Sequence, residues 1–182
     1  MKSLKTIQTL AKVGKILSLI AFILCIVCAV FCAIGVAVLP AMKDKVIQDG
    51  KTLEQLLIEN KTNFITAITV CVIALISTLA GVFTSFLTLR FFKRELEVGT
   101  PFRFEIANKM KKLGLIHVIV SLALLVTIAI IVASVKSGHK ELQDIKGTET
   151  GGTLWFGIAL LILSVFCRYG AEKEDAIEAK AE

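Results

Sequence analysis

Three cysteines at helical spacing are the first residues in this sequence that could do chemistry. Cys25, Cys28 and Cys32 recur at intervals of three and four residues, which places their thiols on one face of a helix. Thiols bind metal ions, but the histidines or carboxylates that usually complete such a site are missing from this segment. Because cysteine also packs as a small apolar residue, we interpret the row as helix packing. We therefore expect neither a metal site nor a cofactor.

Two further features could carry chemistry. Gly50-Lys51-Thr52 resembles the end of a phosphate-binding loop, but Lys45 stands where that motif requires a glycine. His117 lies five residues past Lys112 and one helical turn before Ser121, just inside an apolar segment. An ionisable residue in such a segment is a functional candidate, although this one is shallow enough to reach the interface. No loop carries paired carboxylates beside a histidine or a nucleophile motif, so the sequence predicts no enzyme.

Charged residues fall into five blocks, and the uncharged runs between them define the elements that must position these side chains. The four runs contain 27, 28, 23 and 18 residues. A helix crosses the apolar core of a bilayer with about 20 residues. Because the runs are apolar on all sides and lack the alternation of a barrel strand, they predict helices. We expect an all-α integral membrane protein, a four-helix bundle forming a single domain over 1–182, with spans at about 16–39, 64–90, 113–135 and 153–169.

The distribution of positive charge predicts the orientation. When the blocks are assigned alternately to two sides of a membrane, 14 Lys and Arg residues lie on the side of both termini and seven on the other. Positive residues favour the cytoplasm, so we expect both termini inside, with 171–182 as a polar cytoplasmic tail. The same basic face should lie against anionic lipids of the bilayer. Nucleic acid is not expected as a partner, because binding it would require a folded basic domain outside the membrane.

The predicted outer loop carries a helix-start signal. Thr52-Leu53-Glu54-Gln55 has the capping-box pattern, a threonine followed three residues later by a glutamine. Leu53, Leu56 and Leu57 then share one helical face. The pattern predicts a short helix at about Leu53–Asn60.

The predicted inner loop is typical of a basic amphipathic helix. In Gly99-Thr100-Pro101-Phe102, the glycine favours a turn, Thr100 an N-cap and Pro101 the first helical position. Apolar residues then recur at steps of four, four and three among basic ones and form a single stripe: Phe102, Ile106, Met110 and Leu113. A helix of this kind lies in the membrane interface before the third span, or docks a partner.

Small residues at every fourth position predict close packing of helices. One row lies in the first span and another in the second: Cys25, Ala29, Ala33 and Ala37, and Ser77, Gly81 and Ser85. Such rows let helix backbones approach closely. We expect the first two spans to pack together through them, or one of the two to pack against another copy of the chain.

Three short motifs lie near the ends of the third and fourth spans: Gly99-Thr100-Pro101-Phe102, Lys111-Lys112-Leu113-Gly114 and Arg168-Tyr169-Gly170-Ala171-Glu172. In these motifs the chain resembles the bacterial four-span membrane family catalogued as domain of unknown function 2975. The resemblance implies the bacterial plasma membrane and no established activity. Asn60-Lys61-Thr62 would be a glycosylation site in a eukaryotic chain. Four-span eukaryotic families usually carry paired cysteines in their outer loops, however, and this sequence has none there.

These features together indicate the class of function. We expect a non-enzymatic, multi-pass plasma-membrane protein that binds another membrane component, in a regulatory, stress-response or immunity role. The alternative is a transporter subunit or an oligomeric channel, with a polar path lined by hydroxyl groups in the spans: Thr66, Thr69, Ser77, Thr78, Ser85 and Thr88. No charged residue lies within the predicted spans apart from the terminal Arg90 and Arg168, which weighs against a carrier acting alone.

Overall fold

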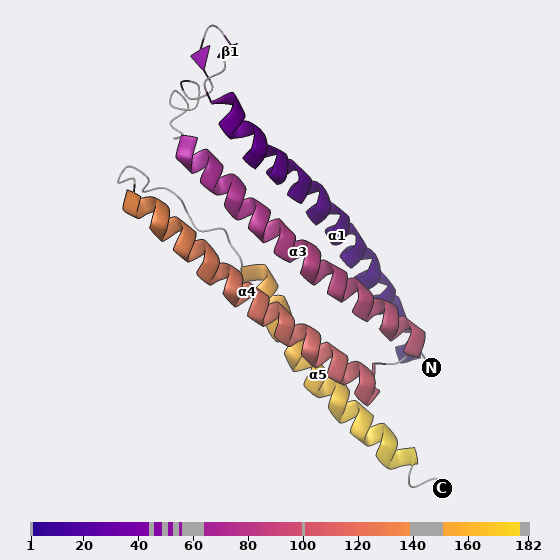
Figure 1. Ribbon diagram of the computed structural model, residues 1–182. Coiled ribbons are helices and arrows are strands. Elements are labelled where there is room, and N and C mark those ends of the chain that lie inside the picture. The colour runs from indigo at the N-terminus through magenta and orange to yellow at the C-terminus, as the bar shows by residue number, and fades with distance from the viewer. Residues whose placement is uncertain are drawn as a thin grey trace. The chain divides into compact units, whose positions relative to one another are not determined.

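The chain folds into long helices. The structure is a computed structural model, and it describes residues 2–43, 46–48, 51–52, 55, 64–99, 101–138 and 151–178. Its helices and strands, in chain order, are α1 (Lys2–Met42), β1 (Val46–Gln48), β2 (Lys51–Thr52), α3 (Phe64–Val98), α4 (Phe104–Gly138) and α5 (Gly151–Glu178) (Figure 1). The four helices confirm the predicted helical fold class and are consistent with a four-helix bundle.

Each of these helices contains a stretch that is long and apolar enough to cross a membrane. The stretches include all four predicted spans: Gln8–Met42, Phe64–Val98, Phe104–Lys136 and Gly152–Lys173. They support a multi-pass membrane protein. The helices continue well past the uncharged runs, because lysine, arginine and glutamate are good helix formers. The polar tail is accordingly helical as far as Glu178.

Contacts gather into two compact units along these helices. Unit 1 comprises Met1–Ile23, Gly81–Ala123 and Glu149–Glu182, and unit 2 comprises Leu24–Ala80 and Leu124–Thr148. Three helices, α1, α3 and α4, contribute residues to both units. The single domain over 1–182 stays a prediction.

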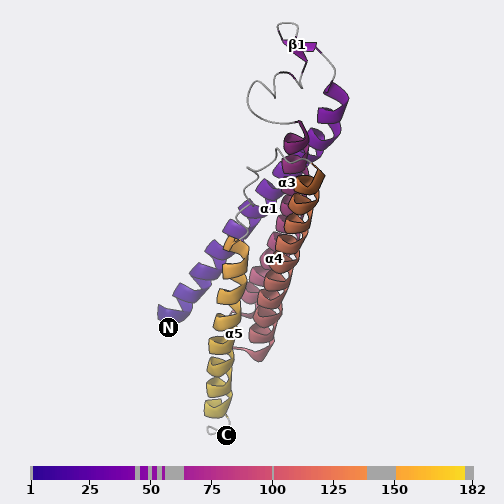
Figure 2. The same cartoon turned by 90° about the vertical axis from the view of Figure 1, so that its left-hand side faces the viewer.

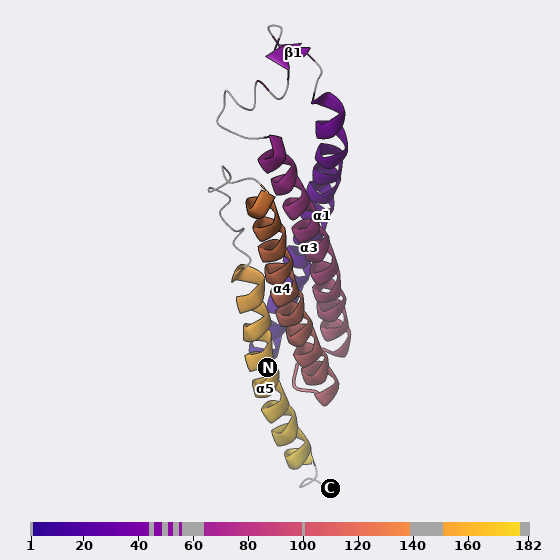
Figure 3. The same ribbon diagram turned by 60° about the vertical axis from the view of Figure 1, so that its left-hand side comes forward.

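The core of unit 1 lies where α3, α4 and α5 meet. Ile106, which is 0% exposed, is at its centre. The buried residues packed with it come from all three helices: Phe91, Ala107, Met110, Leu113, Leu160 and Cys167. The backbones of α4 and α5 approach closely at two glycines, because a Cβ built on Gly114 would lie 2.9 Å from the carbonyl oxygen of Gly157. Figures 2 and 3 both show α5 beside α4.

The turn from α3 to α4 differs from its prediction in detail. Gly99 has a φ of 81° and donates its N–H to the carbonyl oxygen of Glu95 at 2.9 Å, so it ends α3 as a left-handed C-cap. The first hydrogen bond of α4 runs from the N–H of Ala107 to the carbonyl of Arg103 at 3.0 Å. Arg103 is therefore the N-cap. The expectation that Pro101 opens the helix is wrong, because the chain uses residues 101–103 to cross from α3 to α4.

The amphipathic segment is helical, as predicted, but it is the first part of α4 and not a separate helix in the interface. Ile106, Met110 and Leu113 are 0%, 7% and 5% exposed, because they pack against α3 and α5. Only Phe102 of the predicted stripe is exposed, at 36%. Its ring lies against Gly170 of α5, where an added Cβ would clash with Cδ1 of the ring. The stripe therefore faces protein and not lipid.

Unit 2 contains the other parts of α1, α3 and α4, with the two short strands. β1 and β2 pair antiparallel, with Val46 opposite Thr52. The predicted capping box is present as two reciprocal hydrogen bonds, from the N–H of Thr52 to Oε1 of Gln55 at 3.0 Å and from the N–H of Gln55 to Oγ1 of Thr52 at 3.4 Å. Gln55 is helical, and the rest of the predicted helix Leu53–Asn60 lies outside the described residues.

The row of small residues in α1 is only partly buried. Ala29 is buried, whereas Ala33 and Ala37 are exposed. At Gly35, in the same part of α1, an added Cβ would lie 3.5 Å from Sγ of Cys71, an ordinary contact. Tight packing of the first two spans through the whole row is therefore contradicted, because half of the row points away from the protein. Packing against another copy stays a prediction.

Candidate functional site

His117 is held in place by two hydrogen bonds inside unit 1. The ring belongs to α4 and is 3% exposed. Its Nδ1 lies 2.9 Å from the carbonyl oxygen of Leu113, one turn earlier, and its Nε2 lies 3.3 Å from Oγ1 of Thr88 on α3. A carbonyl oxygen can only accept, so Nδ1 carries a proton. In a neutral ring Nε2 is then an acceptor and must accept a hydrogen bond from the hydroxyl group of Thr88.

The hydroxyl group of Thr88 has a second acceptor within reach. Its Oγ1 is 2.9 Å from the carbonyl oxygen of Thr84, on the same helix. A hydroxyl has a single proton, so Thr88 donates either to Thr84 or to His117. Donation to His117 satisfies a neutral ring, and donation to Thr84 fits a protonated ring whose Nε2–H donates to Thr88. The position of one hydroxyl proton therefore depends on the charge of the histidine.

A small cavity of about 270 Å³ adjoins this pair. Phe156 stands edge-on to His117, with ring centroids 5.3 Å apart and planes at 64°. The polar residues that line the cavity come from all four helices of unit 1: Ser18, Thr84, Ser85, Thr88, His117 and Thr153. Two of the predicted candidates, His117 and Ser85, are thus brought together. Ser77 and Gly81 do not line this cavity, and Oγ of Ser77 is a buried atom without a hydrogen-bond partner in the part of the chain described here.

Three of the six hydroxyl groups proposed to line a path, those of Thr69, Thr78 and Thr88, are bonded to carbonyls of their own helix. Thr69 donates to Ile65 at 2.7 Å and Thr78 to Ala74 at 2.9 Å, each to a carbonyl one turn earlier. Such bonds satisfy a hydroxyl group without any external partner. Thr69, Thr78 and Thr88 therefore need no water or solute to satisfy their hydroxyl groups, whereas the buried Oγ of Ser77 has no partner within the described residues.

The cysteine row of α1 does not gather other ligands. Cys28 is exposed, and Cys25 and Cys32 are half-buried. Over the described ranges, no group of three His, Cys, Asp or Glu side chains is placed to hold a metal ion.

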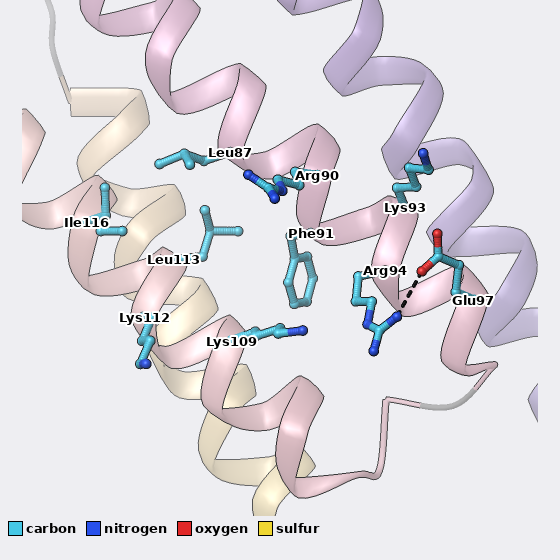
Figure 4. A pocket seen from close by; sticks show the side chains of 10 residues that line it. All are labelled: Leu87, Arg90, Phe91, Lys93, Arg94, Glu97, Lys109, Lys112, Leu113 and Ile116. Carbon is cyan, nitrogen blue, oxygen red and sulfur yellow. Dashed lines mark hydrogen bonds and ion pairs between the residues drawn. The ribbon is translucent and has the colours of Figure 1, made fainter.

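A larger groove lies between α3 and α4, near the turn that joins them. Its volume is about 610 Å³, within the range of roughly 300–1,000 Å³ that ligand pockets occupy. The lining combines five basic residues, one acidic residue and four apolar ones: Arg90, Lys93, Arg94, Lys109 and Lys112, Glu97, and Leu87, Phe91, Leu113 and Ile116 (Figure 4). In Figure 4, Arg90 extends from α3 towards α4 and Lys109 extends from α4 towards α3.

Ion pairs use only part of the positive charge in the groove. Arg94 pairs with Glu97 at 3.1 Å and, across the turn, with Glu105 at 3.2 Å. Lys109 pairs with the same Oε1 of Glu105 at 2.6 Å. The other three basic residues of the groove form no ion pair within the described ranges: Arg90, Lys93 and Lys112. The groove therefore keeps an unneutralised positive surface.

The polarity of the groove changes along its length. Arg90 and Lys112 are the charges that end the second and begin the third predicted span. Leu87, Leu113 and Ile116 lie on the span side of these charges, and Figure 4 shows them at one end of the groove. Arg94, Glu97 and Lys109, which form the ion pairs, lie nearer the turn between α3 and α4. Figure 4 shows Arg90 next to Leu87, so unpaired positive charge adjoins the apolar part of the groove.

From the sequence, the basic residues of this groove were predicted only as separate charges at the ends of the spans. A usable signal was present, because Arg90 and Arg94 are four residues apart and Lys109 and Lys112 are three apart, so each pair shares a helix face. The predicted interface residues Ile106 and Met110 instead form the protein core behind it. Comparison with family models, curated proteins and solved structures finds no match for this chain.

Proposed function

We propose that this protein is a non-catalytic, multi-pass protein of the bacterial plasma membrane that binds another membrane component in the groove between α3 and α4. Both termini and the turn at Gly99 are on the cytoplasmic side in this proposal, and the chain is a member of the four-span bacterial family that it resembles. The observation that carries the proposal is the groove itself, in which three unpaired basic residues adjoin an apolar surface. A partner that combines negative charge with apolar surface is typical of membranes.

A non-catalytic role is supported by the surroundings of Thr88 and His117, a hydroxyl group beside a histidine. Thr88 and His117 have the contact expected of a nucleophile and its base. Acyl transfer also needs free N–H donors for the oxyanion, and within the middle of a helix the backbone N–H groups are already bonded. The hydroxyl of Thr88 is shared with Thr84 and is nearly inaccessible, at 6% exposed for the residue.

Photocrosslinking in native membranes tests this proposal. A benzophenone amino acid at Lys109, inside the groove, should form an adduct of defined mass, whereas the same probe at Lys111 should not. Lys111 is a matched control, because it is exposed on the same helix but does not line the groove. The same adducts from both positions, or none from either, would contradict the proposal.

The second candidate, a transporter subunit or channel, is favoured by the buried His117 beside a cavity with several hydroxyl groups. If it is correct, His117→Phe should abolish a solute or proton flux that wild-type protein supports in liposomes. Absence of flux from wild-type protein would reject this candidate.

A further inference from the structure

We infer that the ligand of the groove is an anionic phospholipid, with its phosphate at the level of Arg90 and Lys112 and an acyl chain along Leu87, Leu113 and Ile116. This inference rests on the proposed function, since it names the membrane component that the groove binds. It concerns one site on the protein and is distinct from the general attraction of basic loops to a charged membrane surface.

Charge complementarity supports an anionic ligand. Arg94 and Lys109 are already bound to carboxylates, so the charge available to a ligand is that of Arg90, Lys93 and Lys112. A phosphate monoanion that accepts hydrogen bonds from an arginine and a lysine would neutralise part of this charge. Guanidinium groups suit phosphate oxygens because their N–H groups form a planar fork.

The position of these charges favours a lipid over a soluble phosphate compound. Arg90 and Lys112 mark the ends of apolar runs, so they lie where headgroups meet hydrocarbon. The apolar residues of the groove continue from that level into the spans. A phospholipid fits both parts at once, since its phosphate lies at the interface and its chains in the hydrocarbon. A soluble phosphate would leave the apolar end of the groove unfilled.

Tryptophan quenching by brominated lipids tests the inference on the full chain. Trp155 is the only tryptophan, so Trp155→Phe provides a background without fluorescence from tryptophan. Into that background, Ile116→Trp places a reporter in the groove, and Leu87→Trp is a second reporter should the first not fold. Leu122→Trp places a control reporter on an exposed position of the same helix, 49% exposed. Each variant is reconstituted into vesicles that contain brominated phosphatidylglycerol or brominated phosphatidylcholine.

Brominated phosphatidylglycerol should quench the groove reporter more strongly than brominated phosphatidylcholine, by a factor on the order of five or more. The control reporter should be quenched nearly equally by the two lipids. The double variant Arg90→Gln/Lys112→Gln should lose this preference. Arg103→Gln/Lys111→Gln removes the same charge from exposed positions outside the groove, and it should keep the preference. Inorganic phosphate, compared with chloride at equal ionic strength, should not relieve the quenching.

Three results would overturn the inference: equal preference at the groove and control reporters, preference that survives the Arg90→Gln/Lys112→Gln change, or competition by inorganic phosphate. The last would identify a soluble phosphate compound as the ligand. A defined protein adduct from Lys109 in native membranes, without any lipid preference in vesicles, would refute the inference and leave the proposed function standing.

Discussion

At the scale of single residues, two acceptors compete for the hydroxyl proton of Thr88. One is the carbonyl oxygen of Thr84 and the other is Nε2 of His117. Because Nδ1 of His117 is fixed as a donor by Leu113, the histidine cannot change tautomer to resolve this competition. The hydroxyl of Thr88 is therefore needed to satisfy a neutral His117.

Thr88→Val should destabilise the protein by about 1–3 kcal/mol, since it leaves Nε2 of a buried ring without a partner. Thermal unfolding in mild detergent measures the effect, and Thr88→Ser, which keeps the hydroxyl, should retain most of the stability. Thr78→Val is the control, because the hydroxyl of Thr78 bonds only to carbonyls of its own helix. Equal losses from Thr88→Val and Thr78→Val would count against the described role of Thr88.

The sequence indicated His117 as a candidate but gave no sign of its partner. Thr88 is 29 residues away on another helix, and the contact depends on which faces of α3 and α4 meet. Hydropathy and spacing describe each helix separately, so they cannot pair two side chains across an interface.

At the scale of helices, α4 begins in protein and not in the membrane interface. A stripe of apolar residues among basic ones fits both surroundings, because each offers an apolar surface beside a polar one. The buried positions of Ile106, Met110 and Leu113 decide between them. The sequence therefore predicted the helix and its apolar face correctly, but not what covers that face.

Ile106→Ala should cost about 2–5 kcal/mol, because it opens a cavity in the core of unit 1. Ile119→Ala removes the same atoms from a position that is 56% exposed, and it should cost much less. Chemical or thermal unfolding of both variants in the same detergent provides the comparison. A loss of stability from Ile106→Ala that is no larger than the loss from Ile119→Ala would contradict the buried position of Ile106.

A close contact between α4 and α5 is made by one glycine from each helix. Gly114 and Gly157 let the backbones of α4 and α5 meet, since a Cβ at Gly114 would lie 2.9 Å from a backbone oxygen that cannot move alone. The rows of small residues in the sequence lie in α1 and α3 and do not include this pair of glycines. A single small residue per helix is too weak a pattern to recognise without knowing the helix pairing.

Gly114→Ala should lower stability by about 1–3 kcal/mol, as expected when an extra methyl group is forced into a packed contact. Gly152→Ala is a matched control in α5, because nothing lies within 4 Å of the Cβ that it would add. Its stability should be unchanged or slightly higher, since alanine favours helices over glycine. Equal shifts of the melting temperature in the two variants would contradict this contact.

At the scale of the whole molecule, the four apolar helices predict the membrane spans, and the two-to-one asymmetry of positive charge predicts their orientation. The helices were predictable because only a helix satisfies the backbone hydrogen bonds of such a long apolar run within the run itself. The orientation is a prediction from the distribution of positive charge. The groove follows from neither, because it depends on where α3 and α4 meet beside Gly99.

The most direct test of the account is a cysteine-accessibility map of intact spheroplasts. The five native cysteines are first replaced, and one cysteine is then introduced at Asn108 or at Gln55, both of which are exposed. The account predicts that a membrane-impermeant maleimide labels Gln55→Cys directly and Asn108→Cys only after the membrane is permeabilised. Direct labelling of Asn108→Cys in sealed spheroplasts would contradict it, because the basic end of α4 would then lie outside the cell.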